Sequence, residues 1–193
     1  MTDGGAKLAP FLDCRRSGFP LHFRLLGGVR DIAPAGSSVA CAMQSFDFKV
    51  VLNCPLETVF SIYVDVNRWR NRNLFGDIQW VQGKPWEEGS RLRIETRVRI
   101  RSTIDQVVQH FTPNESVSYI SHVFGITCET RVTFTPVSDC QTAINVVMQL
   151  IGRTSRSLGF ALEPAIMKAT KGFFEALRKE CETLQPLRPN SSS

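Results

Sequence analysis

The chain has 193 residues, of which 42% are hydrophobic and 21% are charged, with a net charge of +5 and a pI near 9.1. This length suits one domain with a sizeable core, and no apolar run approaches the roughly 20 residues of a membrane-crossing helix. The basic residues alternate along strand-like patterns without aromatic-interleaved clusters, so we expect neither nucleic-acid binding nor stable membrane insertion.

Six cysteines lie at the widely spaced positions 14, 41, 54, 128, 140 and 181. None forms a Cys-x-x-Cys or His-x-Cys spacing, so no metal site and no cofactor are expected. Such scattered thiols favour free cysteines in a reducing cytoplasm over disulfides.

The two ends of the chain differ from its middle. Residues 1–42 are rich in Gly, Pro, Ala and Ser without a sustained period, which predicts a poorly ordered leader. The segment before Cys41 lacks an apolar core, so export is not the favoured interpretation, and Met43 is an alternative natural start. Residues 186–193 are expected to be a disordered tail, which leaves 43–185 as one domain.

Hydrophobic spacing predicts the first elements of that domain. A strand is expected over 46–53, and a helix follows with Pro55 at its first position and an apolar face. A short helix or turn over 66–73 and a strand over 77–83 come next.

The stretch "RLRIETRVRI" (91–100) alternates strictly between mainly charged and mainly aliphatic residues, which predicts a strand with one face in water and the other covered. Four more strands are expected over 103–111, 117–124, 126–135 and 141–151. Their connections are short, which favours an antiparallel meander.

A long helix is expected over 162–184. Its apolar stripe would consist of Leu162, Ile166, Ala169, Phe173, Leu177 and Leu184, with Glu175 and Lys179 on the wetter face. A helix about 10 Å wide cannot cover six or seven strands spaced by about 4.8 Å. The sheet must therefore curl, and extra side chains or a cavity must occupy the remaining space.

This element order resembles the SRPBCC superfamily, the helix-grip fold of START lipid-transfer domains, birch-pollen-type allergens and polyketide cyclase/dehydrase-like proteins. The similarity covers residues 46–184 and is nearest to the cyclase-like branch, on the motifs "CPLETVFSIYVDVNRWRNRN", "WEEGSRLRI", "HFTPNESVSY" and "VTFTPVSDCQTAINVVMQLIG". It implies an α+β fold in which a hydrophobic tunnel between sheet and long helix holds a lipid, polyketide or other small apolar molecule. Most of these motifs are turns and packing positions, so they specify fold better than function.

One side of the strand 103–111 must face the interior. The alternatives are Ile104, Gln106, Val108 and His110, or Asp105, Val107, Gln109 and Phe111, and the sequence alone does not decide between them. The first set is preferred because it carries fewer charges, which makes Gln106 a candidate polar contact with a ligand. The other candidate wall residues are Leu92, Ile94, Val98, Val108, Val132, Phe134, Ile144, Val146, Met148, Ile166, Phe173 and Leu177.

His110 and His122 end adjacent strands and are weak candidates for an acid and base pair, although a half-exposed surface role is favoured. Trp69 and Arg70 are candidates for an entrance, with packing under a loop as the favoured alternative for Trp69. Arg68, Arg70 and Arg72 form the densest positive patch, for which solvation is favoured over an anionic headgroup or a partner protein.

These observations favour binding or transport of a small hydrophobic ligand in a mainly apolar cavity. An alternative is a cyclase or dehydratase that moves protons with His110, His122 or Gln106. A protein-interaction factor that uses the basic entrance helices is a third. The chain contains no Ser-His-Asp order, phosphate-cradling glycine loop or HExxH motif, and hence no catalytic signature.

Overall fold

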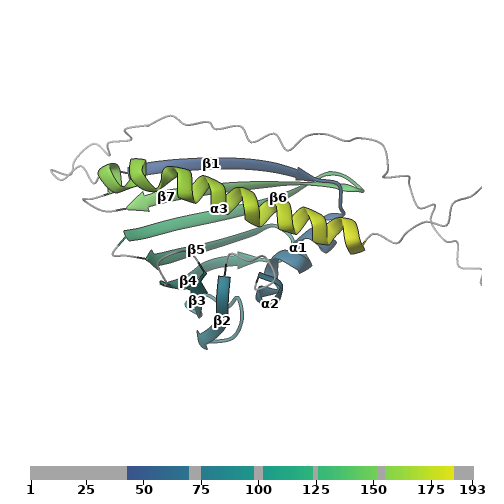
Figure 1. Cartoon of the computed structure of the whole chain (residues 1–193). Coiled ribbons are helices and arrows are strands. Elements are labelled where there is room, and N and C mark those ends of the chain that lie inside the picture. The colour runs from purple at the N-terminus through teal and green to yellow at the C-terminus, as the bar shows by residue number, and fades with distance from the viewer. Residues whose placement is uncertain (1–42, 70–74, 98–101, 124–125, 152–154, 185–193) are drawn as a thin grey trace, which may run out of the picture.

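A computed structural model describes residues 43–69, 75–97, 102–123, 126–151 and 155–184, the side chains at 43, 44, 123, 155–163 and 165–167 excepted (Figure 1). In chain order the elements are β1 (Met43–Leu52), α1 (Leu56–Val64), α2 (Val66–Trp69), β2 (Phe75–Gln82), β3 (Arg91–Thr96), β4 (Thr103–Thr112), β5 (Ser116–Val123), β6 (Ile126–Ser138), β7 (Gln141–Ile151) and α3 (Ser155–Leu184). No helix in these ranges has the length and apolar character needed to span a membrane.

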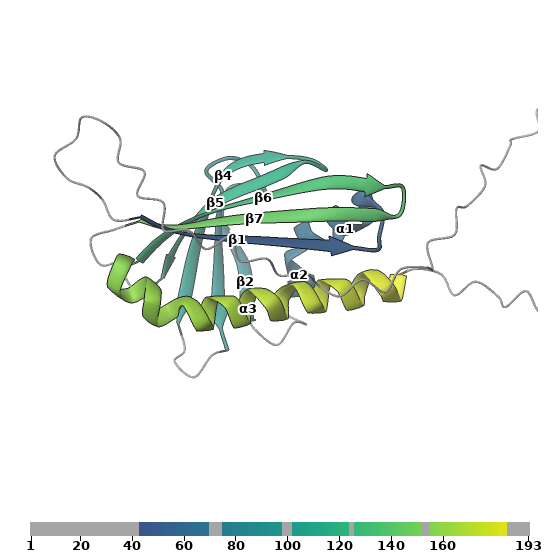
Figure 2. The same ribbon diagram turned by 90° about the horizontal axis from the view of Figure 1, so that it is seen from above.

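The strands form one seven-stranded antiparallel sheet in the order β1-β7-β6-β5-β4-β3-β2. Strands β2 to β7 are the predicted meander, and β1 joins its far edge by pairing with β7 from Met43↔Ile151 to Leu52↔Thr142. Figure 2 shows α3 running lengthwise beside β1, with α1 and α2 near its C-terminal half. The predicted α+β helix-grip architecture is confirmed.

The sheet has one covered and one exposed face, here called the inner and outer faces. On β3, Leu92 and Ile94 are each 1% exposed on the inner face, and the arginines between them are exposed. On the outer face, Arg93 Nε lies 2.8 Å from Asp105 Oδ1 of β4. The covered side of the alternating stretch is therefore the core of the domain.

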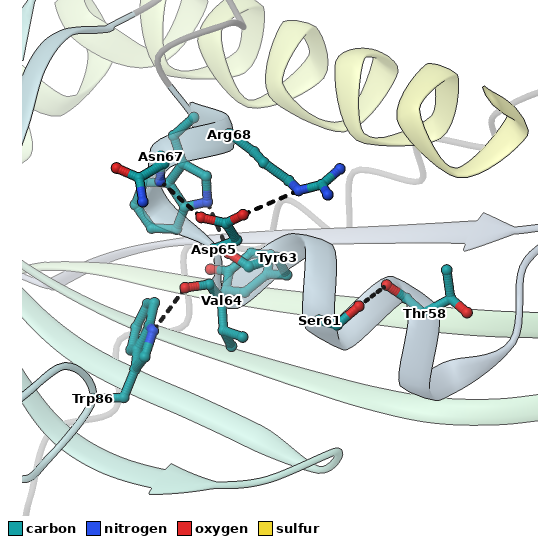
Figure 3. A network of polar contacts seen from close by, with 9 residues as sticks. Thr58, Ser61, Tyr63, Val64, Asp65, Asn67, Arg68 and Trp86 are labelled. Carbon is teal, nitrogen blue, oxygen red and sulfur yellow. Dashed lines mark hydrogen bonds and ion pairs between the residues drawn. The ribbon is translucent and has the colours of Figure 1, made fainter. Parts of the chain in front are cut away.

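The turn between α1 and α2 is built on backbone groups that the end of α1 leaves without helical partners (Figure 3). The Nε1–H groups of Trp69 and Trp86 donate to the carbonyl oxygens of Tyr63 and Val64, each at 2.8 Å. Asp65 accepts from the Asn67 amide and from Arg68 Nε, both at 3.1 Å. The Trp69 indole and the Asp65 carboxylate thus hold α2 against α1, and the Trp86 indole joins the connection between β2 and β3 to the same turn.

The start of α1 differs slightly from the prediction. Pro55 has a ψ of 149°, which is extended rather than helical, so it is the N-cap and the helix begins at Leu56. Its carbonyl oxygen still accepts from the Val59 amide at 3.0 Å.

Helix α3 is longer than predicted and presents a different stripe. It begins at Ser155, and the predicted members Ala169 and Leu184 are exposed, whereas Phe174, Leu177 and Cys181 are at most 3% exposed. The 3,4 spacing of these buried residues defines a stripe rotated from the predicted one, since packing against α1 and β1 sets the helix orientation.

On its polar side, Glu175 Oε1 lies 3.9 Å from Lys171 Nζ.

The cysteines divide into two kinds. Cys54, Cys128 and Cys181 are buried free thiols, as expected from the sequence. Cys140 is disulfide-bonded, so the expectation of free thiols is wrong at that position.

Candidate functional site

A row of polar side chains crosses the inner face between apolar neighbours. Gln106 of β4 pairs with Ser121 of β5, and Ser121 pairs with Cys128 of β6. The row ends at Leu92 of β3 on one side and at Leu150 of β7 on the other. Because directly opposite residues have Cβ atoms about 4.5–5.5 Å apart, the three polar groups lie next to one another.

The adjacent row adds hydroxyl groups. Tyr119 of β5 pairs with Thr130 of β6, and its phenol is within hydrogen-bonding reach of Thr130 and of Tyr63 from α1. Cys128 Sγ lies 3.8 Å from Thr130 Oγ1. The two rows together form what we call the inner polar cluster, which consists of Tyr63, Gln106, Tyr119, Ser121, Cys128 and Thr130.

The inner polar cluster is neutral at pH 7. Burial raises the pKa of the Tyr119 phenol to about 12, with smaller opposing effects from the Tyr63 and Thr130 hydroxyls. Burial likewise raises the pKa of the Cys128 thiol, partly offset by Thr130. Among the described residues, the strand positions of the inner face carry no charged side chain.

Two members of the inner polar cluster lack partners. Ser121 is only 7% exposed and Gln106 is partly buried, yet in the described part of the chain neither side chain makes a hydrogen bond. In the described ranges, the side-chain polar atoms that are fully enclosed and lack a hydrogen-bond partner are Ser90 Oγ and Arg178 Nε. The polar atoms of Ser121 and Gln106 are not among them. The Ser121 hydroxyl therefore faces accessible space on a covered face of the sheet.

The opposite end of the inner face is filled by aromatic rings. Phe60 and Tyr63 of α1 each lie 5.1 Å, centroid to centroid, from Phe134 of β6. Tyr63 also lies 5.9 Å from Phe173 of α3, and Trp69 lies 5.6 Å from Phe173. The α1 end of the domain is thus closed by edge-to-face packing.

Most candidate wall residues that the structure describes lie on the inner face or on α3. The fully buried ones, at most 4% exposed, are Leu92, Ile94, Val108, Val132, Phe134, Ile144, Val146 and Leu177. Met148 and Phe173 are partly buried and pack against the same core. Val98 lies outside the described residues, as does the side chain of Ile166.

The candidate entrance residues have different outcomes. Trp69 is 3% exposed and packs within the aromatic cluster, in line with the packing alternative. Arg70 lies outside the described residues. Of the positive patch, only Arg68 is described, and it pairs with Asp65 at 3.1 Å.

The structure places His110 on the outer face, unlike the side preferred from the sequence. Ile104, Gln106 and Val108 do share the inner face, but a register shift between Val108 and His110 breaks the alternation. The shift is a β-bulge, which turns His110 outward and Phe111 inward. The exposed imidazole of His110 contacts Glu88 Oε1 at 3.1 Å and Thr112 Oγ1 at 2.9 Å.

His122 also lies on the outer face, where it is opposite Asp105 in the strand register. Its Nδ1 lies 3.2 Å from Thr127 Oγ1. His110 pairs with Ser118, four positions before His122 along β5, so roughly 13 Å of strand separates the two histidines. The structure does not bring them together as an acid and base pair.

Sequence reasoning found only Gln106 of the inner polar cluster. Tyr119 and Ser121 lie in "VSYISHV", where polar residues occur on both faces and neither face stands out. Ser121 could have been found as the residue opposite Gln106 on the neighbouring strand. That step requires the register of β4 and β5, which includes a bulge in β4.

No protein-family model matches the chain, and no curated protein matches it. Solved structures do resemble it. Ara h 8.0201 is 12% identical with a TM-score of 0.64, over 73% of this chain and 99% of that one. The ZhuI aromatase/cyclase from Streptomyces sp. R1128 is 12% identical with a TM-score of 0.62, over 72% and 94%. A START superfamily protein from Mycobacterium smegmatis is 15% identical with a TM-score of 0.58, over 73% and 99%. These likenesses confirm the helix-grip fold expected from the sequence.

Proposed function

We propose that the chain binds a small, largely apolar molecule between the inner face of the sheet and α3. The observation that carries this proposal is the incomplete burial of the inner face around the inner polar cluster. Ile104 and Met148 point to the covered side of the sheet yet remain partly exposed, and Ser121 has no partner in the described residues. A filled protein interior is close-packed and satisfies its buried polar groups.

The proposed ligand would lie at the end of the domain away from α1. The aromatic cluster occupies the space near Phe111, at the C-terminal end of β4, whereas Ile104 and Gln106 lie at the other end of the same strand. The proposed site therefore extends from the inner polar cluster toward the N-terminal half of α3. Apolar contact there would supply about 25 cal/mol per Å² of ligand surface buried.

The structural neighbours are compatible both with this function and with a cyclase-type enzyme. One of them is named as an aromatase/cyclase and another as a START superfamily protein. For this chain, an enzyme that uses His110 or His122 is less favoured because both lie on the outer face. A protein-interaction surface on the entrance helices is less favoured because Arg68 is neutralised by Asp65. A cytoplasmic location remains part of the proposal; the three free thiols Cys54, Cys128 and Cys181 favour it, and the disulfide at Cys140 argues against it.

Native mass spectrometry after gentle purification, with organic extraction of any adduct, is the first test. A second test titrates the protein with the neutral apolar dye Nile red. Met148→Trp would fill the proposed space and is expected to weaken dye binding at least tenfold. Gln149→Trp, on the outer face of the same strand, is the matched control and should leave it unchanged.

A bare mass together with no dye uptake by the unmodified chain would overturn the proposal. Equal dye binding by both tryptophan variants would show that any dye site lies elsewhere on the surface.

A further inference from the structure

Two members of the inner polar cluster, Gln106 and Ser121, are not explained by folding. An alanine at Ser121 and a leucine at Gln106 would suit an apolar sheet face, since a buried polar group without a partner destabilises the folded state. Ser121 is 7% exposed, directly opposite Gln106, and both side chains are unpartnered within the described residues. The missing hydrogen-bond partner is therefore to be sought outside the protein.

The charge of the site restricts that partner. The described strand positions of the inner face include no Asp, Glu, Lys, Arg or His. An ionised carboxylate or phosphate held against these strand positions would lose its hydration without gaining an opposite charge from them, which is unfavourable. The chemistry favours a neutral group.

The hydrogen-bonding capacity of the two side chains defines the group further. The Gln106 amide offers two N–H donors and a carbonyl acceptor, and the Ser121 hydroxyl donates and accepts. A single oxygen between them can accept from both, and a hydroxyl can also donate back. In the neighbouring row, the Tyr119 phenol already interacts with Tyr63 and Thr130, so we assign the contact with a ligand to Gln106 and Ser121.

We propose that Gln106 and Ser121 select a neutral apolar ligand that carries a carbonyl or hydroxyl oxygen, and discriminate against ligands with an ionised headgroup. This inference rests on the proposed function and specifies the ligand class of the same site. The remaining surface of the ligand is apolar, because the inner-face neighbours of Gln106 include Leu92, Ile104 and Val108.

The test uses four ten-carbon ligands that differ in one group, namely decane, decan-1-ol, 2-decanone and decanoate. Each displaces bound Nile red from the full chain, from Ser121→Ala, from Gln106→Leu and from the control His122→Ala. His122 is on the same strand as Ser121 but on the outer face. Comparing each ligand across variants removes differences in its own solubility, and thermal melts confirm that each variant is folded.

Ser121→Ala and Gln106→Leu should each raise the displacing concentration of decan-1-ol and 2-decanone about fivefold, the size expected for one hydrogen bond, and leave that of decane unchanged. Decanoate should compete at least tenfold less well than decan-1-ol at pH 7.5 and improve as its carboxylate becomes protonated at lower pH.

Decanoate as the tightest competitor at pH 7.5, or variants that affect decane and decan-1-ol equally, would overturn this inference while the proposed function stands. Failure of the unmodified chain to bind Nile red at all would instead overturn the proposed function.

Discussion

Replacing Leu177 by alanine tests the packing on which the proposed site depends. Leu177 is 0% exposed in the centre of the contact between α3 and the rest of the core. Removing a buried leucine side chain and leaving a cavity destabilises proteins by 2–5 kcal/mol, and we expect about 3 kcal/mol here. For a domain of this size, each 1 kcal/mol lowers Tm by about 2–4 °C, so the expected decrease is about 6–12 °C.

Leu184→Ala provides the matched control. Leu184 lies two helical turns after Leu177 on the same helix and is 50% exposed, so its loss should change the free energy of unfolding by at most about 0.5 kcal/mol. Urea denaturation followed by both far-ultraviolet circular dichroism and tryptophan fluorescence measures the difference. Equal effects of the two substitutions would refute the docking of α3 on the sheet and, with it, the covered inner face.

Three further predictions concern the surroundings of the site. The phenol of Tyr119 should ionise near pH 12 in an ultraviolet titration. Because its folded-state pKa exceeds the ordinary value of about 10, the stability it contributes below pH 10 should be lost as pH rises through 12. Tyr119→Phe should remove this dependence of the unfolding free energy on pH. Trp86→Phe deletes the donor to the Val64 carbonyl and should lower the free energy of unfolding by about 1–3 kcal/mol in urea melts, whereas no loss would mean that water replaces the indole. Gly83→Ala should destabilise more than Gly89→Ala in thermal melts, since both have φ near +80° (+75° and +79°) but only at Gly83 would a new Cβ meet a serine Cβ at 2.9 Å.

Local periodicity was sufficient to predict the elements of this domain. The strict alternation of "RLRIETRVRI" identified Leu92 and Ile94 as inner-face residues, and both are 1% exposed. Short connections between alternating segments predicted the antiparallel meander, since parallel strands need long crossovers. These inferences succeeded because the two-residue period of a strand is a property of the chain itself.

The details of the site depended on contacts between distant segments. The β-bulge after Val108 turned His110 outward, and it is visible only in the pairing of β4 with β5. The buried stripe of α3 includes Phe174 and Cys181 instead of Ala169 and Leu184, because contacts with α1 and β1 orient the helix.

Residue order along the chain thus accounts for the fold class, the order of the elements and the covered face of the strictly alternating strand β3, because these follow from local backbone geometry. Only the tertiary structure decided which polar residues meet. Gln106, Ser121 and Cys128 come from three different strands, and the register of those strands brings them into one row. Register depends on turn geometry and bulges as well as on the hydrophobic pattern, so the pattern of one strand does not fix it.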